Sequence, residues 1–356
     1  MLLTQPFDLQ RLAVSGEAQA VAEGVLELNS GRFAFSTAPN GVLAFLRRSN
    51  LNLLTQLTWL DRSGKALATI GQPARFSSPA IAPDGSRVAV TRHVDKGSEI
   101  WTFDVNLGTT TRITNEASVE SRWPLWTPDG RRIAFTASPR DDAGGHVYVS
   151  GADGSGTAVA LIEGFTNVLG LDWSRDGTRL LYRLISPTET SSAGLWLLGA
   201  AGSAPVPYRA DRLAYVQATV SPDGRWLAYT SPENGRTDVY IESFPTPGRR
   251  ALLSPSGGVQ PRWRRDQTEL YYVSLEGDLL AVPVDLGAGA KLAPHPVRLF
   301  KPALNNSQGN NIKGFRSIYT PPLYDVAPDG RFLVAIVQPE EQDREPVIVS
   351  LPATPR

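Results

Sequence analysis

The residues that could perform acid–base or metal chemistry are scarce in this chain of 356 residues. It contains three histidines, His93, His146 and His295, and no cysteine. No two of these histidines have the spacing of a zinc finger or of a helical metal site, so we expect no bound metal. We place His93 and His146 in solvated loops. Disulfides are excluded, and the redox compartment of the protein stays open.

Paired carboxylates occur at Asp141-Asp142 and at Glu340-Glu341. Such pairs can act as general acid and base or hold Ca²⁺ when they lie in a cleft at a suitable separation. Both pairs fall in segments with the composition of loops, and we interpret them as solvated turns. The sequence also lacks a Gly-x-Ser-x-Gly elbow, a phosphate-binding glycine loop and an EF-hand loop. We therefore expect no catalytic residue and no cofactor.

A three-residue turn signature recurs along the chain and divides it into repeats. It consists of Pro or Arg, then Asp or Asn, then Gly, which is typical of a type I turn closed by a residue in the left-handed conformation. We assign these acidic residues to turn formation and not to catalysis. The second position of the turn is Asn40, Asp84, Asp129, Asp176, Asp223, Asp266 and Asp329, and Gln267 replaces glycine in the sixth copy.

Each turn is surrounded by the same pattern of apolar residues. Runs of branched and aromatic residues such as Ile133–Phe135 follow it and are typical of buried strands. A bulky residue such as Trp126 precedes the turn by three positions, and another such as Trp101 follows it by 14 to 20 positions. With a fourth strand, each repeat of about 45 residues holds four strands. Four-stranded units of this length, arranged radially, are propeller blades.

We therefore predict an all-β fold, a single β-propeller over residues 1–356 with seven four-stranded blades, and six or eight blades stay open. Strands from both termini should share the closing blade, because this removes exposed sheet edges. Leu2–Asp8 resembles Leu279–Asp285, whereas Val347–Leu351 competes for the same blade, and which strand is outermost stays open. The expected segments are 1–28 (completing the last blade), 29–71, 72–115, 116–164, 165–210, 211–254 and 255–300 (blades one to six), 301–322 (an insertion loop) and 323–356 (the last blade).

Charge and hydropathy limit the partners. Lysine plus arginine equals aspartate plus glutamate, 35 each, so we expect no nucleic acid partner. No apolar stretch approaches the roughly 18 residues needed to span a bilayer. The first residues also lack the basic and apolar regions of a signal peptide. We expect a monomer without a membrane span.

The segment Ser221–Ile241 reads Ser-Pro-Asp-Gly-Arg, then Leu-Ala-Tyr-Thr-Ser and Asp-Val-Tyr-Ile, and it resembles the TolB-like family of β-propeller repeats. Leu60–Lys65, Trp226–Phe244 and Gln260–Asp266 are similar to propellers fused C-terminally to bacterial serine/threonine protein kinases. The resemblance implies a ligand- or protein-binding module, commonly in the periplasm. The chain itself has no glycine-rich loop, His-Arg-Asp or Asp-Phe-Gly motif of a kinase. Its start in mid-blade is consistent with the tail of a longer protein.

The inner strands of a propeller surround its channel, and the segments entering them line the wider mouth. Positions six to seven residues before the turns are polar or aromatic, unlike the apolar strand bodies. The insertion Lys301–Pro322 falls on the same rim, and long loops on a rigid scaffold often carry binding function. Arg262 belongs to an arginine cluster beside Trp263, which could bind an anion. The predicted binding site comprises Ser78, Arg122, Trp123, Gln217, Gln260 and Arg262.

The sequence thus favours a non-catalytic scaffold that binds a protein, a small molecule or a glycan at the channel mouth. An enzyme of the glycan lyase or hydrolase type that uses the channel is the alternative.

Overall fold

The computed structural model describes residues 2–22, 27–28, 32–33, 35–37, 42–45, 54–95, 97–114, 119–139, 145–162, 168–184, 194–199, 203–211, 213, 215, 217–286, 291–292, 296–302, 322–338 and 347–350. The chain divides into two compact units. One is Leu54–Val337, and the other combines Met1–Leu53 with Gln338–Arg356. All described elements are strands, and the described residues contain no helix that could cross a membrane.

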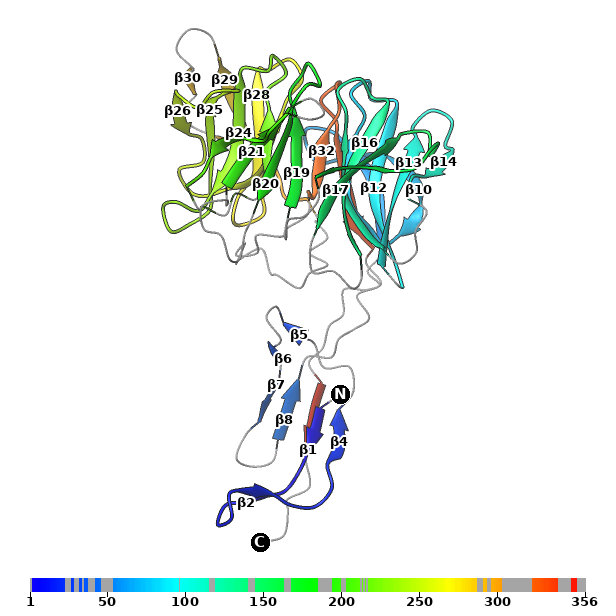
Figure 1. Cartoon of the computed structure of the whole chain (residues 1–356), viewed down its shortest axis with the longest axis vertical. Coiled ribbons are helices and arrows are strands. Elements are labelled where there is room, and N and C mark those ends of the chain that lie inside the picture. Colours follow the sequence, from blue (N-terminus) through cyan, green and yellow to red (C-terminus); the bar gives the residue numbers. More distant parts are fainter. Residues whose placement is uncertain are drawn as a thin grey trace. The chain divides into compact units, whose positions relative to one another are not determined.

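The described strands of the unit Leu54–Val337 form a β-propeller of six four-stranded blades, which we number I to VI (Figure 1). Its inner strands contact one another in the order β11, β15, β19, β23, β27, β32 and back to β11, so the ring is closed. Blade I consists of β11 (Phe76–Ile81), β12 (Arg87–Val94), β13 (Gly97–Asp104) and β14 (Thr110–Arg112). Blade II consists of β15 (Val119–Trp126), β16 (Arg132–Pro139), β17 (His146–Gly151) and β18 (Val159–Ile162). Blade III consists of β19 (Val168–Trp173), β20 (Leu180–Leu184), β21 (Gly194–Leu198) and β22 (Val206–Arg209).

Blades IV to VI continue the ring. Blade IV consists of β23 (Ala218–Val220), β24 (Trp226–Ser231), β25 (Asp238–Ser243) and β26 (Arg250–Leu252). Blade V consists of β27 (Val259–Trp263), β28 (Glu269–Val273), β29 (Leu279–Asp285) and β31 (Val297–Phe300), and β30 (Lys291–Leu292) also pairs with β29. Blade VI consists of β32 (Tyr324–Val326), β33 (Phe332–Val337), β9 (Thr55–Leu60) and β10 (Ala66–Ala74).

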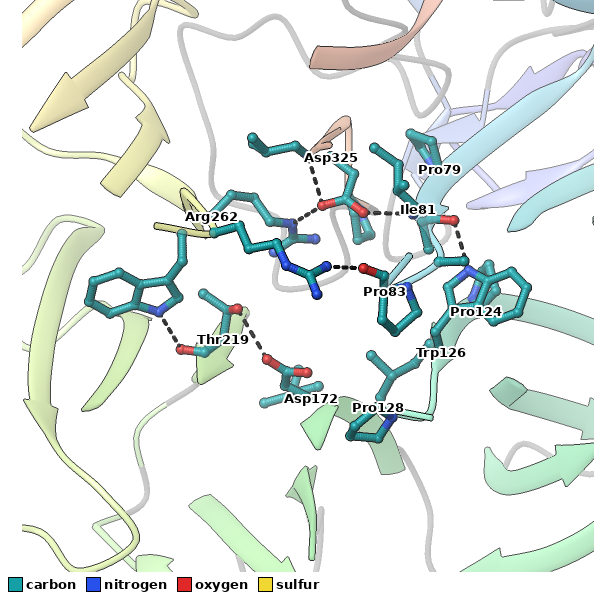
Figure 2. A pocket seen from close by; sticks show the side chains of 18 of the residues that line it. Pro79, Ile81, Pro83, Pro124, Trp126, Pro128, Asp172, Thr219, Arg262 and Asp325 are labelled. Atoms are coloured by element: carbon teal, nitrogen blue, oxygen red, sulfur yellow. Dashed lines mark hydrogen bonds and ion pairs between the residues drawn. The ribbon is translucent and has the colours of Figure 1, made fainter. Parts of the chain in front are cut away.

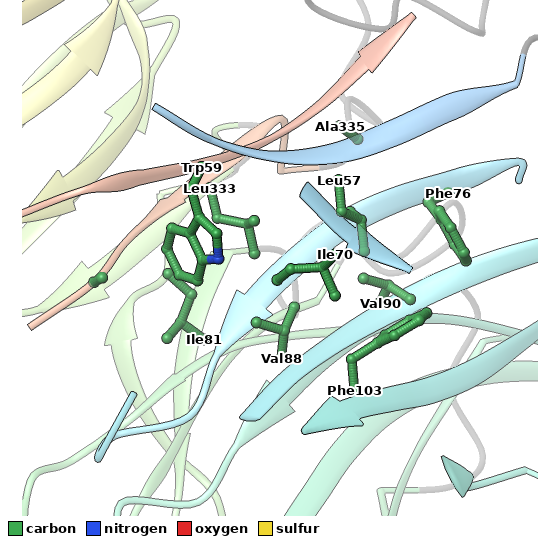
Figure 3. Packing of buried hydrophobic residues seen from close by; sticks show 11 residues of the cluster. Leu57, Trp59, Ile70, Phe76, Ile81, Val88, Val90, Phe103, Leu333 and Ala335 are labelled. Atoms are coloured by element: carbon green, nitrogen blue, oxygen red, sulfur yellow. The ribbon is translucent and has the colours of Figure 1, made fainter. Parts of the chain in front are cut away.

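Blade VI closes the ring with strands from both ends of this unit. β33 pairs antiparallel with β9, so that Leu57 lies opposite Ala335. The sequence analysis assigned the completing strands to residues 1–28, whereas β9 and β10 occupy this place in the structure. The physical reason is burial: Leu57 and Trp59 pack against Val88 of blade I (Figure 3), whereas Leu3 is half exposed. A strand that closes a propeller must be apolar enough to cover its neighbour.

The second unit contains shorter sheets. β7 (Phe35–Thr37), β8 (Val42–Phe45) and β34 (Val347–Ser350) form one sheet, and the other pairs are β1 (Leu2–Thr4) with β4 (Gln19–Ala22), β2 (Phe7–Asp8) with β3 (Ala13–Val14), and β5 (Glu27–Leu28) with β6 (Arg32–Phe33). The turn at Asn40 lies between β7 and β8, outside the described residues. Six of the seven turn signatures therefore fall in the propeller unit, which has six blades where seven were the main expectation. β34, which competed for the last blade, pairs with β8.

The turns between the first two strands of each blade have the predicted chemistry. In blade IV, Gly224 is left-handed (φ 72°), and Asp223 Oδ1 accepts hydrogen bonds from Ser221 Oγ and from the Arg225 backbone N–H. Gln267 adopts the same conformation in blade V (φ 59°) without being glycine. In the amide orientation that satisfies both of its polar atoms, the side chain reaches the preceding turn, where its nitrogen donates to Asp223 Oδ1 over 3.0 Å. The turn is thus conserved in shape, and the glutamine adds a contact between blades IV and V.

Candidate binding channel

The six inner strands enclose a cavity of about 450 Å³ along the propeller axis (Figure 2). Each blade contributes one residue to the wall four positions before its turn aspartate; these residues are Ala80, Leu125, Asp172, Thr219, Arg262 and Asp325. A second ring, which we call the turn-side ring, consists of the residues directly before the turn aspartates: Pro83, Pro128, Arg175, Pro222, Arg265 and Pro328. Since every blade delivers equivalent positions, the residue types at these positions determine the chemistry of the channel.

The two aspartates of the wall bind the backbone of the next blade. Asp325 Oδ2 accepts the Ile81 backbone N–H over 2.7 Å, which joins blade VI to blade I. Its Oδ1 lies 3.4 Å from Arg262 Nε of blade V. Burial raises the pKa of the Asp325 carboxyl, while Arg262 and the backbone N–H donors oppose this rise. Asp172 repeats the arrangement, because its Oδ2 accepts from the Val220 backbone N–H over 2.7 Å.

Two tryptophans fasten other pairs of blades. Trp126 Nε1 donates to the Ala80 carbonyl over 2.9 Å, and Trp263 Nε1 donates to the Thr219 carbonyl over 3.0 Å. Both indoles are buried and line the cavity with one edge. These tryptophans therefore belong to the core, as expected, and also contribute apolar surface to the channel.

Both arginines of the turn-side ring are exposed and bond to backbone carbonyls of other blades. Arg175 Nε donates to the Ser221 carbonyl over 3.0 Å, and its Nη2 lies 3.8 Å from Asp172 Oδ2. Arg265 Nη1 of blade V donates to the Pro83 carbonyl of blade I. This bond links blade V to blade I, and the Arg265 side chain lines the cavity.

Of the six residues predicted for the binding site, Trp123 and Arg262 line the cavity. Ser78, Gln217 and Gln260 are buried in the wall. Gln260 Oε1 accepts the Leu323 backbone N–H over 2.8 Å, and Gln217 Oε1 accepts the Gln260 backbone N–H over 3.2 Å. The two glutamines thereby connect blades IV, V and VI.

Arg122, the sixth predicted residue, is half-buried and forms an ion pair with Glu120 in its own strand. Burial lowers the pKa of Arg122. The backbone N–H of its neighbour Trp123 donates to Thr91 Oγ1 of blade I over 3.1 Å.

Ser78, Trp123 and Gln260 share an unusual backbone conformation. Their φ angles are 53°, 57° and 57°, in the left-handed region that normally favours glycine. All three stand six positions before the turn aspartate, where the pairing of the first two strands has a bulge. Such outliers are costly and cluster at ligand-binding sites. The residue types gave no hint of this conformation, although the repeat offset selected the same positions.

A Ser–His contact lies close to this part of the wall. Ser77 Oγ and His93 Nε2 are 2.8 Å apart. Burial, with the charges of Arg122 and Arg75, lowers the pKa of His93 to about 4, so its ring is neutral at pH 7 and a weak base. His93 lies in β12 and His146 begins β17, and both are half-buried, in contrast to the predicted solvated loops.

Several predicted features lie outside the described residues: His295, Asp141-Asp142, Glu340-Glu341 and most of the insertion Lys301–Pro322. In the ranges that are described, no group of three or more His, Asp or Glu side chains could hold a metal ion. The sequence analysis missed Asp172, Asp325 and Arg175. The sequence contains a signal for them, because they are charged residues at repeat positions where other repeats carry Ala, Leu, Thr or Pro.

No family model matches this chain. A stretch of 111 residues is 32% identical to the uncharacterized peptidase YuxL of Bacillus subtilis. The match covers 30% of this chain and only 16% of that peptidase.

Solved propellers are similar over most of the chain. A putative TolB from Agrobacterium tumefaciens has 14% identity and a TM-score of 0.56, covering 80% of this chain and 99% of that one. TolB from Acinetobacter baumannii has 17% identity and a TM-score of 0.52, covering 83% and 78%. An oligogalacturonate lyase in complex with manganese has 13% identity and a TM-score of 0.53, covering 83% and 86%. At these identities the likeness shows the fold alone, and it confirms the predicted β-propeller with TolB-like neighbours.

Proposed function

We propose that this chain is a non-catalytic scaffold that binds a ligand or a protein partner at its central channel. The observation that supports this most strongly is the cavity of about 450 Å³ whose wall takes residues from all six blades. Its volume falls in the range of roughly 300–1,000 Å³ that is usual for ligand sites. Its lining combines proline and tryptophan surface with a few charged groups, which is the usual composition of a specific site.

The charged groups of the channel favour binding over catalysis. Asp172 and Asp325 accept hydrogen bonds from backbone N–H groups of the neighbouring blades. Each of these carboxylates therefore has a structural role that accounts for its place in the wall. The polar residues thus fix the shape of the channel, and a rigid, preformed site binds with a low entropic cost.

At the mouth, we propose Trp123 as the main contact, with Arg122 and Arg262 beside it. Trp123 is half-buried, lines the cavity and is held by a strained backbone. Aromatic residues next to arginine dominate the energetics of many interfaces. Ser78, Gln217 and Gln260 would support this surface from within the wall.

The resemblance of Leu60–Lys65 and Trp226–Phe244 to kinase-fused propellers supports a wider role. We propose the sensor or interaction domain of a larger protein, such as a receptor-type bacterial kinase, with the propeller in the periplasm. The coding sequence directly upstream of Met1 tests this. An in-frame kinase domain and membrane span would support the role, and a stop codon next to an unrelated gene would overturn it.

A lyase is the second candidate, because the fold resembles an oligogalacturonate lyase that was solved with manganese. The test is incubation of the whole chain with oligogalacturonate and Mn²⁺, followed by the absorbance of an unsaturated product. Turnover would favour the enzyme, and its absence beside an active control lyase would remove this candidate.

The scaffold proposal is tested with the double substitution Arg122→Ala, Trp123→Ala. A thermal-shift screen of peptides, sugars and small organic acids against the whole chain first identifies a ligand. The double variant should weaken its binding by about 2 kcal/mol while the melting temperature stays nearly unchanged. If Trp123 is instead a core residue, the free energy of unfolding of the double variant should fall by about 3–5 kcal/mol, and that result would contradict a binding site at the mouth.

A further inference from the structure

The turn-side ring of the channel is chemically uneven. Four blades place proline directly before the turn aspartate, where its fixed φ suits the first turn position. Blades III and V instead carry Arg175 and Arg265. Both arginines line the cavity and both are exposed, so this end of the channel combines apolar proline faces with two guanidinium groups.

The charges lining the cavity do not cancel. Three arginines and two aspartates line it. Asp325 lies 3.4 Å from Arg262, and Asp172 lies 3.8 Å from Arg175. Arg265 forms no ion pair with any carboxylate among the described residues. Among the described residues, Arg265 is therefore the one of these three arginines without an anionic partner.

The position of Arg265 makes this charge available to a ligand. Its Nη1 is bonded to the Pro83 carbonyl of blade I, and the side chain lines the cavity. Within the described part of the chain, its Nε and Nη2 have no hydrogen-bond acceptor. A guanidinium is planar and offers paired donors that match a carboxylate, and apolar walls strengthen such a contact by excluding water.

We infer that the turn-side end of the channel binds a small carboxylate with an apolar body. The carboxylate would accept hydrogen bonds from Nε and Nη2 of Arg265. The apolar body would lie between Pro128, Pro222 and Pro328. This inference rests on the proposed binding function of the channel and names the chemical class of one ligand.

The experiment titrates the whole chain with 3-phenylpropionate and with its neutral analogue, 3-phenylpropionamide, at low ionic strength. Trp126 and Trp263 line the cavity, so intrinsic fluorescence reports binding, and calorimetry checks it. The acid should bind at least about tenfold more tightly than the amide, because a charge-assisted hydrogen bond is lost in the amide. Equal affinities, or no saturation by the acid up to about 10 mM, would overturn the inference.

Variants assign the effect to a residue. Arg265→Gln should weaken acid binding by at least about tenfold and leave the amide unaffected, and Arg265→Lys should recover part of the affinity. The matched control is Arg225→Gln, an exposed arginine beside another turn that does not line the cavity. Equal weakening in the Arg225 variant would show a nonspecific charge effect and overturn the site.

The same titration separates this inference from the proposed function. In one outcome, a ligand from the thermal-shift screen no longer binds the Arg122→Ala, Trp123→Ala variant but binds Arg265→Gln normally, and the acid does not bind the wild type. The mouth then binds a ligand, and the carboxylate site is wrong. If the acid binds through Arg265 while the screen finds no ligand that depends on Trp123, the carboxylate site stands and the mouth proposal fails.

Discussion

Trp59 of β9 lies directly opposite Leu333 of β33, and this pair joins the two ends of the propeller unit. Trp59 is almost fully buried and Leu333 is completely so. On the other face of this blade, Leu60 and Phe332 pack against Tyr271 of blade V. The β9–β33 pairing therefore carries two blade interfaces at once, and the stability of the whole ring should depend on it.

The closing strand provides a direct test of this arrangement. Leu57→Ala should lower the free energy of unfolding by about 2–5 kcal/mol, since the side chain is fully buried in blade VI. Leu3→Ala is the control in the second unit, where the side chain is half exposed, and should change it by less than about 0.5 kcal/mol. Urea unfolding measures both. A costly Leu3→Ala with a mild Leu57→Ala would show that Leu2–Thr4 closes the ring.

A second prediction concerns the glutamine that replaces glycine at the fifth turn of the ring. Gln267→Gly should relieve about 1 kcal/mol of backbone strain but lose the side-chain contact with Asp223, so we expect a net change near zero. Gln267→Ala keeps the strain and loses the contact, and should destabilise by about 1 kcal/mol. Urea unfolding of the two variants separates these contributions. Stabilisation by alanine would mean that the contact with Asp223 is absent in solution.

The repeats could be predicted from the sequence because each one restates the same local chemistry. Proline, aspartate and glycine specify the turn at Asp223. A tryptophan three residues before the turn aspartate, as at Trp126 and Trp263 of blades II and V, specifies an inner strand. Which strand closes the ring could not be predicted in the same way. Leu2–Asp8 and Val347–Leu351 both have the composition of strands, and only the packing of Thr55–Leu60 against blades I and V shows which strand closes the ring.

The candidate site was predicted only in part for a related reason. A channel position can be read from its offset to a turn, and this offset selected Trp123, which lines the cavity. Whether a polar side chain faces the channel or bonds to the next blade depends on the closed ring. Gln260 bonds to Leu323 of blade VI, and Asp325 bonds to Ile81 of blade I. Neither partner can be deduced from one repeat alone.

Glu269, which joins blade V to the turn between β9 and β10, should contribute to the acid sensitivity of the fold. Arg62 donates two hydrogen bonds of 2.6 Å to its carboxylate, and Tyr271 and Arg264 add further donors. The Arg62 contact lowers the pKa of Glu269 to about 2, against an ordinary value near 4.5. Because the pKa is lower in the folded state, the stabilisation is complete above about pH 4.5 and is lost as the pH falls toward 2.

The size of this effect is on the order of 2 kcal/mol, because half of the Arg62 side chain is exposed and solvent screens the pair. The free energy of unfolding of the wild type should therefore fall between pH 5 and pH 2.5, and Glu269→Gln should reduce that slope. Glu276→Gln is the control, since this side chain is exposed on a neighbouring hairpin. An unchanged slope in Glu269→Gln would contradict the assignment.

Asp325 should respond to pH in the opposite sense. Burial raises the pKa of its carboxyl in the folded protein, so its ionised form is disfavoured there. A group with a raised pKa contributes stability at low pH and loses it as the pH rises through the folded-state pKa. Asp325→Asn keeps an oxygen that can accept the Ile81 N–H but carries no charge. The stability of the variant relative to the wild type should therefore increase from pH 3 to pH 7.

The comparison needs a variant that separates charge from the hydrogen bond to the next blade. Asp325→Ala removes both, leaves the Ile81 N–H and Arg262 without their partner, and should destabilise by about 2–4 kcal/mol at every pH. Asp172→Asn stands at the same repeat position in blade III and tests whether the pH effect is specific to the junction of blades VI and I. If Asp325→Asn lost stability relative to the wild type as the pH rose, the ion pair with Arg262 would outweigh the cost of burial. The carboxylate would then hold the ring together mainly through its charge.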